Sequence, residues 1–422
     1  MTVVTMLLMF VAALSSVTIS AERRYEPLPA YCEGSMMPYD FDAVEPCAWP
    51  DTLRPVYCAY VARHGARYMT GSGKFKALEK VLIQARRQGT ITADGIAFLG
   101  MIDSIRTLSH DRWGELSGVG IDEERRLGSE ILDAYPALRT PGASVGTLSS
   151  FVPRAIMTMY EFNHSLALGN DSLETVAESG PAFSPLVYCF AYDKSYAEWR
   201  KNGAWQEVVA EMERDSIGLE PLQRLTGNAE GIDAERGRKL VMEIYSVLQS
   251  RRAMGLSAPD TRWMSRDEYR RCWQVSNLTH YLRNSVSGME SRTLSRATAP
   301  LIHAIINGAD SAASAPERRP RLDGYFGHAE TLLPLLSVMR IPGCYALPLD
   351  YNRLSQSWQL QRITPLGANL AVFLLEGPSD RIYAAVRLNG RNVAPLQGKP
   401  SIVPWSELRD YWLYILSSLT MY

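Results

Sequence analysis

A histidine between two arginines is the pattern in this chain that most clearly indicates chemistry. The letters RHGAR at residues 63–67 directly follow an apolar run at 56–62. Guanidinium forks bind phosphate oxygens in pairs, and Arg63 and Arg67 would repel each other unless an anion lay between them. A neutral imidazole such as that of His64 is then a nucleophile toward phosphorus. The segment predicts a phosphoryl-transfer site without a metal, although a lone histidine in such a place is commonly a structural residue.

A second histidine motif repeats this arrangement later in the chain. A short apolar run at 322–326 is followed by Gly327, His328 and Glu330. The carboxyl ends of parallel strands share one edge of a sheet, so both motifs are expected to face one phosphate. Repulsion from that anion raises the pKa of a nearby carboxylic acid, which suits Glu330 to protonate a departing oxygen. Taken singly, His328 and Glu330 fit a plain helix start equally well; beside the first motif they indicate catalysis.

The elements that must position these residues follow from the periodicity of the sequence. The apolar runs at 56–62, 322–326 and 369–376 have the length and composition of buried strands. An Asn-Gly pair at 389–390 between two further apolar stretches predicts a hairpin. The segment 193–304 instead carries mostly helical patterns. We therefore predict an α/β protein with a mixed, mostly parallel sheet flanked by helices and an inserted α-helical cap domain.

The chain is expected to divide into four parts. Residues 1–21 form an apolar run with small residues at its end, which is typical of a secretory signal peptide. Because no Lys or Arg precedes this run and two arginines follow it, an uncleaved N-terminal anchor stays open. The α/β core is predicted over 22–168 and 320–422, and the mainly helical cap over 169–319.

Other features are mildly consistent with a secretory route. Three N-glycosylation sequons begin at Asn163, Asn170 and Asn277. The six cysteines could form up to three disulfides in an oxidising compartment, and their wide spacing without a CxxC pair argues against a zinc site. We expect a secreted protein or one in the lumen of an endomembrane compartment, with no stable membrane span once the signal is removed.

Composition excludes some partners and cofactors. The formal net charge is −1, and there is no basic tail, so nothing supports binding of nucleic acid. The six histidines are scattered, and no HExxH motif is present, which argues against a metal-dependent hydrolase. We expect a small phosphorylated molecule as the ligand and no cofactor, whereas the oligomeric state is left open.

At this point the two motifs resemble the histidine phosphatase superfamily, in its branch with an N-terminal RHG motif and a distal His-acid motif. The sequence HAETLLPLLSVM most resembles multiple inositol polyphosphate phosphatases, because related acid phosphatases carry His-Asp instead. The resemblance runs from roughly residue 50 to 415 and is weak through the cap. It includes the segments LSSFVPRAIMTMYEF, QRITPLGANLAVFLLE and RIYAAVRLNGRNVAPL.

The resemblance implies a role for each catalytic residue. His64 is expected to be the nucleophile and to form a phosphohistidine. His328 would add a hydrogen bond to the phosphoryl group, and Glu330 would protonate the leaving oxygen and then help to activate water. Two positions depart from the family pattern, because Met69 replaces a usual proline and Thr158 lies where small residues are usual.

The resemblance also implies which residues bind phosphate. Arg63, Arg67 and Arg154 would hold the three non-bridging oxygens, although the residues alone would leave Arg154 as an ordinary surface arginine. Lys74 and Lys76 follow the first motif, where the family often directs lysines toward further phosphates, and they fit the solvated face of a helix equally well.

A disulfide between Cys189 and Cys272 is implied by matching family positions. The cap after Cys272 is shorter than in relatives, which leaves the range of substrates open.

Three functions follow from these observations. The preferred one is metal-independent hydrolysis of inositol polyphosphates, similar to the activity of phytases. A second is a broad-specificity secreted acid phosphatase for small esters, and many cationic side chains from the cap facing the site would argue against it. A third is a binding protein for phosphorylated ligands that has lost catalysis, but binding alone would not require Glu330.

Overall fold

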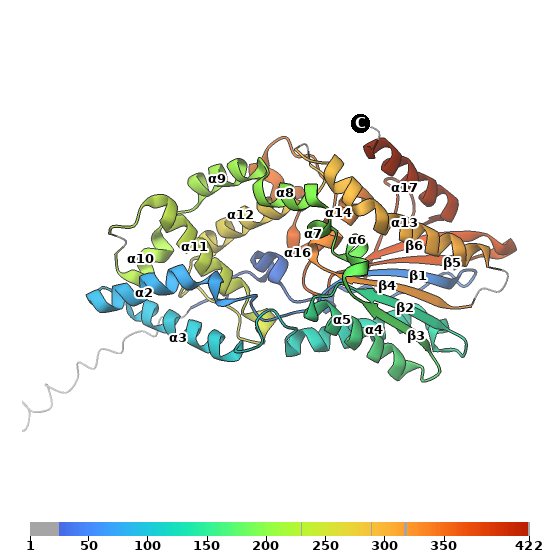
Figure 1. Ribbon diagram of the computed structural model, residues 1–422, viewed down its shortest axis with the longest axis horizontal. Coiled ribbons are helices and arrows are strands. Elements are labelled where there is room, and N and C mark those ends of the chain that lie inside the picture. Colours follow the sequence, from blue (N-terminus) through green and yellow to red (C-terminus); the bar gives the residue numbers. More distant parts are fainter. Residues whose placement is uncertain (1–24, 229, 288, 316–318, 421–422) are drawn as a thin grey trace, which may run out of the picture.

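An eight-stranded sheet forms the centre of the computed structural model, with helices on both of its faces (Figure 1). The structure describes residues 25–420 apart from 229, 288 and 316–318, so the expected signal peptide lies outside the described residues. The strands are β1 (Arg54–Arg63), β2 (Ser144–Ser149), β3 (Glu174–Ser179), β4 (Arg321–Gly327), β5 (Asn369–Glu376), β6 (Ile382–Leu388), β7 (Arg391–Val393) and β8 (Ile402–Pro404).

The order of the strands confirms the predicted mixed sheet. Along the sheet the strands run β3-β2-β4-β1-β5-β6-β7, and β8 pairs with β6. β1 to β4 pair in parallel, whereas β5 is antiparallel to β1 and β6 is antiparallel to β5. The parallel strands therefore end together at one edge, as the two histidine motifs require.

β1 is buried on both faces, and its residues alternate between two hydrophobic cores. Tyr57 and Val61 pack into the core with α13, α14 and α17, whereas Cys58 and Tyr60 pack into the core with α4 and α5. This alternation with a period of two is the geometry of a strand covered on each side by helices. The helices that cover the sheet are α4 (Gly118–Ala134), α5 (Pro153–Gly169), α6 (Ser184–Val187), α7 (Cys189–Tyr192), α13 (Arg292–Ser314), α14 (Ala329–Val338) and α17 (Trp405–Thr420).

A second group of helices lies beyond the carboxyl ends of the parallel strands (Figure 1). In the described part of the chain, five helices between residues 194 and 284 belong both to the predicted cap and to this group. The group consists of α2 (Lys76–Gln88), α3 (Ala93–Leu108), α8 (Lys194–Asn202), α9 (Trp205–Ser216), α10 (Glu220–Thr226), α11 (Ala234–Gln249) and α12 (Arg266–Asn284), with the short α15 (Leu354–Ser357) and α16 (Leu360–Ile363) beside it.

The arrangement differs from the predicted domain boundaries at three places. β3 lies within the predicted cap but extends the sheet beside β2, and α13 packs against β1 and α14. Conversely, α2 and α3 belong to the predicted core but pack against α10 and α11. β3 gave no strand signal because all six of its residues are exposed, so it lacks an apolar pattern. An amphipathic stripe such as that of α2 predicts a helix but not its neighbour.

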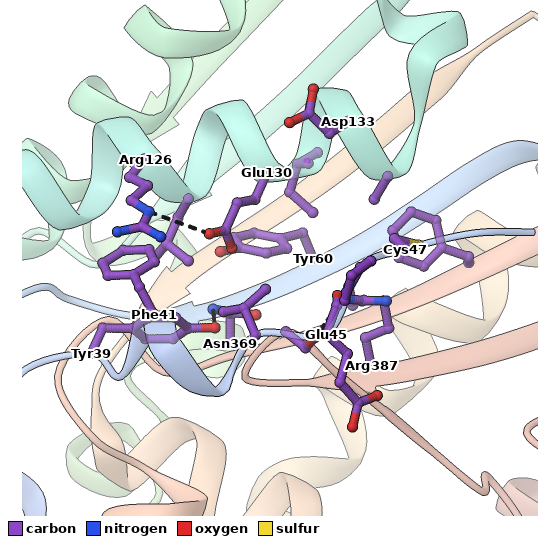
Figure 2. Close-up of a pocket in the computed structure, with 18 residues that line it drawn as sticks. Tyr39, Phe41, Glu45, Cys47, Tyr60, Arg126, Glu130, Asp133, Asn369 and Arg387 are labelled. Carbon is purple, nitrogen blue, oxygen red and sulfur yellow. Dashed lines mark hydrogen bonds and ion pairs between the residues drawn. The ribbon is translucent and has the colours of Figure 1, made fainter.

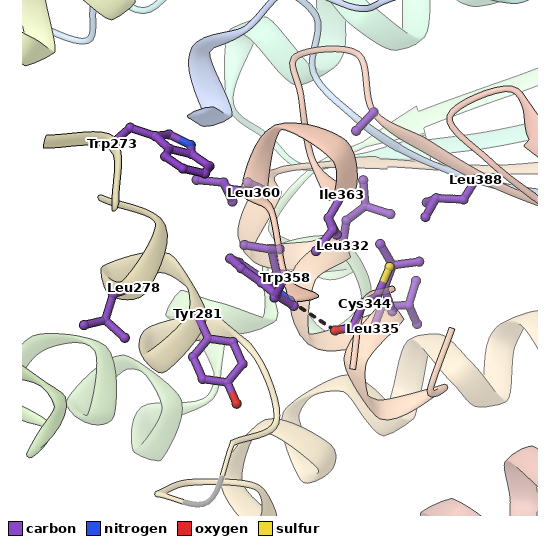
Figure 3. Close-up of a cluster of buried hydrophobic side chains, with 14 of the residues drawn as sticks. Trp273, Leu278, Tyr281, Leu332, Leu335, Cys344, Trp358, Leu360, Ile363 and Leu388 are labelled. Carbon is purple, nitrogen blue, oxygen red and sulfur yellow. Dashed lines mark hydrogen bonds between the residues drawn. The ribbon is translucent and has the colours of Figure 1, made fainter. Parts of the chain in front are cut away.

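A cluster of large apolar side chains joins the helical group to the core (Figure 3). Trp358 is fully buried, its ring packs edge-on against Tyr281 at 5.3 Å, and its Nε1 donates to the carbonyl of Cys344 at 3.3 Å. Leu332 and Leu335 of α14 belong to the same cluster. α12 and α14 are therefore held in one packed unit, which fixes the residues that each contributes to the site.

Two local features define the ends of elements, and the second confirms the predicted hairpin. Ser265 and Glu268 form a reciprocal capping box at the start of α12. Asn389 and Gly390 have φ values of 50° and 72°, the left-handed conformations of the predicted hairpin turn between β6 and β7. Among the helices that the structure describes, none is long and apolar enough to cross a membrane.

The implied disulfide between Cys189 and Cys272 is not formed. All six cysteines are free thiols. Cys189 packs with Tyr196 and Leu294 in a small cluster beside α7, whereas Cys272 lies in the main core on α12. Burial raises the pKa of Cys189 to about 12, so each thiol serves as a small apolar side chain.

The sequons do not present free asparagines. Asn170 and Asn277 are buried, and their side-chain nitrogens donate to the carbonyls of Leu138 and Trp358 respectively. Asn163 is half-buried and donates to Thr147 at 2.7 Å. A glycan on Asn170 or Asn277 would require these contacts to break, and glycosylation of the three sequons stays a prediction.

Candidate active site

The ends of three parallel strands assemble the site. In the sheet Arg63 pairs with Gly327, so the residues that follow them, His64 and His328, emerge side by side. The backbone N–H of His64 donates to the Gly327 carbonyl at 3.1 Å, and the N–H of Ser150 donates to that of Phe326 at 3.0 Å. The two motifs, predicted to face one ligand, therefore meet at the same edge.

A cavity of about 400 Å³ opens at this edge, between the strand ends and the helical group. It contains six cationic side chains but a single carboxylate, that of Glu330. The cavity is thus built for an anion with several negative charges. The cationic and imidazole side chains that line it are Arg63, His64, Arg67, Lys74, Arg154, Arg200, His280 and Arg283.

The loop after β1 is held by close packing against α4. Gly65 does not adopt a positive φ. A Cβ atom on Gly65 would instead lie 2.9 Å from Glu124 Oε1 and 3.0 Å from the carbonyl of Gly120. Lack of space, rather than a left-handed backbone conformation, therefore requires glycine at this position. Thr158, one of the departures from the family pattern, accepts a hydrogen bond from the Gly65 N–H at 3.1 Å.

Glu123 of α4 holds the loop in place from the side of the helix, a role that no sequence pattern indicates. Its carboxyl accepts hydrogen bonds from the N–H groups of Ala66 at 2.7 Å and Tyr39 at 2.8 Å. Burial raises its pKa to about 7, although these bonds favour the anion. In the sequence Glu123 lies in a run of charged residues that fits an exposed helix face, so only the fold reveals it.

His64 is set up as a nucleophile. Its Nδ1 lies 3.0 Å from the carbonyl oxygen of Gly65, which requires the proton to be on Nδ1 and leaves the lone pair on Nε2. Burial lowers the pKa of His64 well below its ordinary value, and the guanidiniums of Arg154, Arg63 and Arg67 lower it further. The imidazole is therefore neutral at physiological pH, as attack on phosphorus requires.

Three arginines surround His64 without any carboxylate in ion-pair contact with them in the part of the chain that is described. Arg63 donates to the carbonyls of Ser35 and Thr364, and Arg67 to that of Tyr68. Burial is the first cause that lowers the pKa of Arg63 to about 10 and that of Arg67 to about 9. The Nε atoms of Arg63, Arg67 and Arg154 are buried without a hydrogen-bond partner, which leaves donors for an incoming anion.

His328 supports Arg154 in the ligand-free site. Its Nδ1 lies 3.4 Å from Nη2 of Arg154, and its Nε2 lies 3.0 Å from the hydroxyl of Ser150. Because a guanidinium only donates, Nδ1 must accept and Nε2 carries the proton. Burial and the charge of Arg154 lower the pKa of His328 to about 3. The predicted hydrogen bond from His328 to the phosphoryl group stays a prediction, since both nitrogens are engaged here.

Glu330 is the one acid in the cavity, and it is ionised. Burial alone would raise its pKa, but an ion pair with Arg200, at 2.9 Å, and nearby imidazoles outweigh burial and lower the pKa to about 2. The sequence predicted a raised pKa in the presence of a phosphate. A bound anion must therefore raise this pKa before Glu330 can donate a proton.

The helical group adds cations that the sequence did not reveal. Arg200 of α8 and Arg283 of α12 line the cavity, and Lys74 lies at its margin. Lys76, the other predicted lysine, is exposed at the start of α2 and does not line it. Neither Arg200 nor Arg283 is near a motif in the sequence, and no local pattern marks either residue. Their Nε atoms are buried without a partner.

A separate cavity of about 290 Å³ lies between α4 and the β5–β6 side of the sheet (Figure 2). Its cations are already engaged: Arg126 lies over the ring of Phe41 at 3.9 Å and pairs with Glu130 at 3.6 Å. Arg387 donates to the carbonyl of Glu45 at 2.5 Å. Phosphate chemistry therefore belongs to the cavity at the strand ends. In the described residues no group of three or more His, Cys, Asp or Glu is arranged to hold a metal ion.

The family follows from this fold and site together with a sequence match. The model of the histidine phosphatase superfamily (branch 2) matches residues 57–389, a range that includes both histidine motifs. The chain belongs to this superfamily and is a histidine-type phosphatase. A comparison with curated proteins finds no significant match.

Several solved structures share the fold at low sequence identity. One is a Bifidobacterium longum multiple inositol polyphosphate phosphatase in complex with inositol hexasulfate, with TM-score 0.72, 15% identity, and coverage of 90% of this chain and 97% of that chain. Another is the phytase from D. castellii, with TM-score 0.69, 18% identity, and coverage of 92% and 85%. At such identities the likeness establishes the fold alone.

Proposed function

We propose that the protein hydrolyses phosphate monoesters of inositol polyphosphates without a metal, through a phosphohistidine at His64. The observation that carries this proposal is the neutral imidazole of His64 among three arginines that lack carboxylate partners in the described residues. Such an arrangement is costly to keep without a ligand, because the guanidiniums repel one another. A bound phosphate would offset that repulsion.

In the first step Nε2 of His64 attacks the phosphorus atom. The bond from phosphorus to the ester oxygen breaks, and the electron pair stays on that oxygen, which takes a proton from Glu330. Arg63, Arg67 and Arg154 stabilise the charge on the three non-bridging oxygens in the transition state. The proton of His64 stays on Nδ1, which donates to the Gly65 carbonyl, so the cationic phosphohistidine keeps its orientation.

In the second step water attacks the phosphohistidine. The water gives a proton to the carboxylate of Glu330, the bond from phosphorus to nitrogen breaks, and inorganic phosphate leaves. His64 is again neutral and Glu330 again carries a proton, so the cycle consumes only ester and water. Glu330 acts first as an acid and then as a base, as the chemistry of two successive displacements requires.

The charges of the cavity support a polyphosphorylated substrate. A single phosphate dianion engages the three arginines around His64. Arg200, Arg283 and Lys74 remain in the same cavity, beyond these three. A monoester of a neutral alcohol would leave Arg283 and Lys74 without an anionic partner and Arg200 on Glu330, whereas an inositol ring with several phosphates would supply a phosphate for each of the three. The related Bifidobacterium protein was solved with inositol hexasulfate, an analogue of such a ligand.

Phosphate release from inositol hexakisphosphate tests the proposal. The purified chain in excess EDTA is compared with His64→Ala. We expect release by the wild type and none by the variant. Loss of activity in EDTA would contradict the metal-independent mechanism. Release from small esters alone would favour a broad acid phosphatase, and binding without release from any ester would indicate a protein that only binds phosphorylated ligands.

A further inference from the structure

Arg200 connects the helical group to the proton donor. Its Nη2 donates to Glu330 Oε1 at 2.9 Å, and its guanidinium lies over the ring of Phe190 with Cζ 4.8 Å from the ring centroid. The Nε of Arg200 is buried and has no hydrogen-bond partner. The arginine therefore lines the cavity with an unused donor while another of its nitrogens holds the catalytic acid.

Within the described residues, no cation other than Arg200 forms an ion pair with Glu330. Cations and imidazoles face its carboxylate from every element around it, but Arg200 is the one cation in ion-pair contact with it in the described part of the chain. The groups that face it are Arg200 and Tyr196 of α8, His280 and Arg283 of α12, Arg63 at the end of β1, Arg67 in the loop that follows, Arg154 of α5 and His328 before α14.

A first phosphate neutralises only part of the positive charge around Glu330. Its negative charge is taken up by Arg63, Arg67 and Arg154 around His64. The ion pair of Arg200 with Glu330 stays intact and continues to favour the anionic carboxylate, which has no proton to give. A dianionic phosphate on a neighbouring carbon of the same substrate competes for Arg200, because it carries more charge and accepts two parallel hydrogen bonds from a guanidinium.

We propose that Arg200 is a positioning residue that makes proton donation by Glu330 depend on a second phosphate of the substrate. When that phosphate draws Arg200 away, Glu330 takes a proton from solvent through the mouth of the cavity and is ready to protonate the leaving oxygen. When the substrate has one phosphate, Arg200 stays on Glu330 and catalysis is slow. This inference rests on the proposed function and adds a selectivity that acts on kcat rather than on binding.

The pH dependence of kcat distinguishes this device from simple binding. Two esters with similarly poor leaving groups are compared, inositol hexakisphosphate and glycerol 2-phosphate. In the wild type, kcat should fall with rising pH at a lower pH for glycerol 2-phosphate than for the hexakisphosphate, because Glu330 stays ionised. This fall is the limb that the variants are expected to move. In Arg200→Gln that limb should move up by about one pH unit or more. The preference in kcat for the hexakisphosphate should fall about tenfold at the same time.

Two further variants serve as controls. Arg200→Lys keeps the charge beside Glu330 and should retain the low limb for glycerol 2-phosphate. Arg283→Gln removes another cation of the same cavity that makes no ion pair with Glu330, so it should raise KM for the hexakisphosphate and move the limbs less than Arg200→Gln does. Turnover of p-nitrophenyl phosphate, whose leaving group needs little protonation, reports whether the site of each variant is folded.

Several outcomes would overturn the inference. One is an Arg200→Gln variant that raises KM for both esters while the limbs stay where they are in the wild type, which would make Arg200 only a binding group. If that variant is inactive on p-nitrophenyl phosphate, the wild type alone decides, because coincident limbs for the two esters contradict the inference. A wild type that hydrolyses none of the three esters would instead refute the proposed function itself.

Discussion

At the scale of single residues, the proposed mechanism divides the work between a neutral nucleophile, His64, and an acid, Glu330, that begins ionised. His64 is kept neutral by burial and by the arginines around it, and its contact with the Gly65 carbonyl directs Nε2 toward the ligand. Glu330 begins as an anion that Arg200 holds. Chemistry therefore starts only when a bound anion changes the charge balance of the cavity.

Replacement of the acid should depend on the leaving group. Glu330→Gln removes the proton that an alkoxide needs, so we expect kcat for glycerol 2-phosphate to fall by about 10²- to 10⁴-fold. The same change should lower kcat for p-nitrophenyl phosphate by less than about tenfold, because nitrophenolate leaves without a proton. Steady-state kinetics on both esters measures the difference. Equal losses on both would show that Glu330 does not act as the acid.

The sequence identified the central residues because they are local to strand ends. His64 and His328 each follow an apolar strand, and parallel strands end at one edge, so their meeting could be predicted. Glu123, Arg200 and Arg283 could not, because each lies on a helix whose sequence resembles an ordinary charged face. Their function depends on which helix packs against the site, and that is decided by the whole fold.

At the scale of elements, the start of α4 fixes the loop that carries His64. A Cβ atom on Gly120 would lie 2.1 Å from the carbonyl oxygen of Ala66, which is closer than any non-bonded contact allows. Ser117, the N-cap of α4, donates its backbone N–H to the same carbonyl at 2.9 Å. The loop and the start of α4 are therefore in direct contact, and neither can move without the other.

Two alanine substitutions on α4 test this coupling. In Gly120→Ala the new methyl group must displace backbone of the loop, and we expect kcat to fall about tenfold or more because the catalytic geometry shifts. Gly118→Ala, on the same helix, is the matched control, since nothing lies within 4 Å of its added Cβ. It should leave kcat unchanged. Similar kcat values for the two variants, measured on folded protein, would show that the loop does not depend on this packing.

At the scale of the whole molecule, the site is the boundary between the sheet and the helical group. Arg63 and His64 come from the sheet, whereas Arg200 and Arg283 come from helices, and the buried cluster around Trp358 holds the two together. The predicted α/β architecture with a helical addition is confirmed, but the packing of the helices does not follow the predicted domain boundaries. α2 and α3 join the helical group, and α13 joins the sheet, because amphipathic patterns do not specify neighbours.

Glu124, which lies buried behind the active-site loop, makes one contribution to the dependence of folding stability on pH. Burial raises its pKa well above 4.5, Glu123 raises it further, and both of its oxygens lack partners. The folded state therefore binds the proton more tightly than the unfolded state. The contribution of Glu124 to the free energy of unfolding is greatest below pH 4.5. It falls as pH rises toward the folded pKa, by about 1.4 kcal/mol per pH unit.

Glu124→Gln should remove this penalty. We expect the variant to be more stable than the wild type by about 1 to 3 kcal/mol at pH 7, with a smaller difference at pH 5. Denaturant unfolding at the two pH values measures both free energies. A difference that is the same at pH 5 and pH 7 would mean that Glu124 has an ordinary pKa in the folded protein.

The central claim is that a phosphoryl group passes through His64, and trapping that intermediate tests it most directly. The chain is mixed with inositol hexakisphosphate, quenched in alkali during turnover, digested and examined by mass spectrometry. We predict a peptide that contains residue 64 and carries the added mass of one phosphoryl group on His64, stable in alkali and lost in acid. Turnover with the label on another residue, or continued turnover by His64→Ala, would contradict the account.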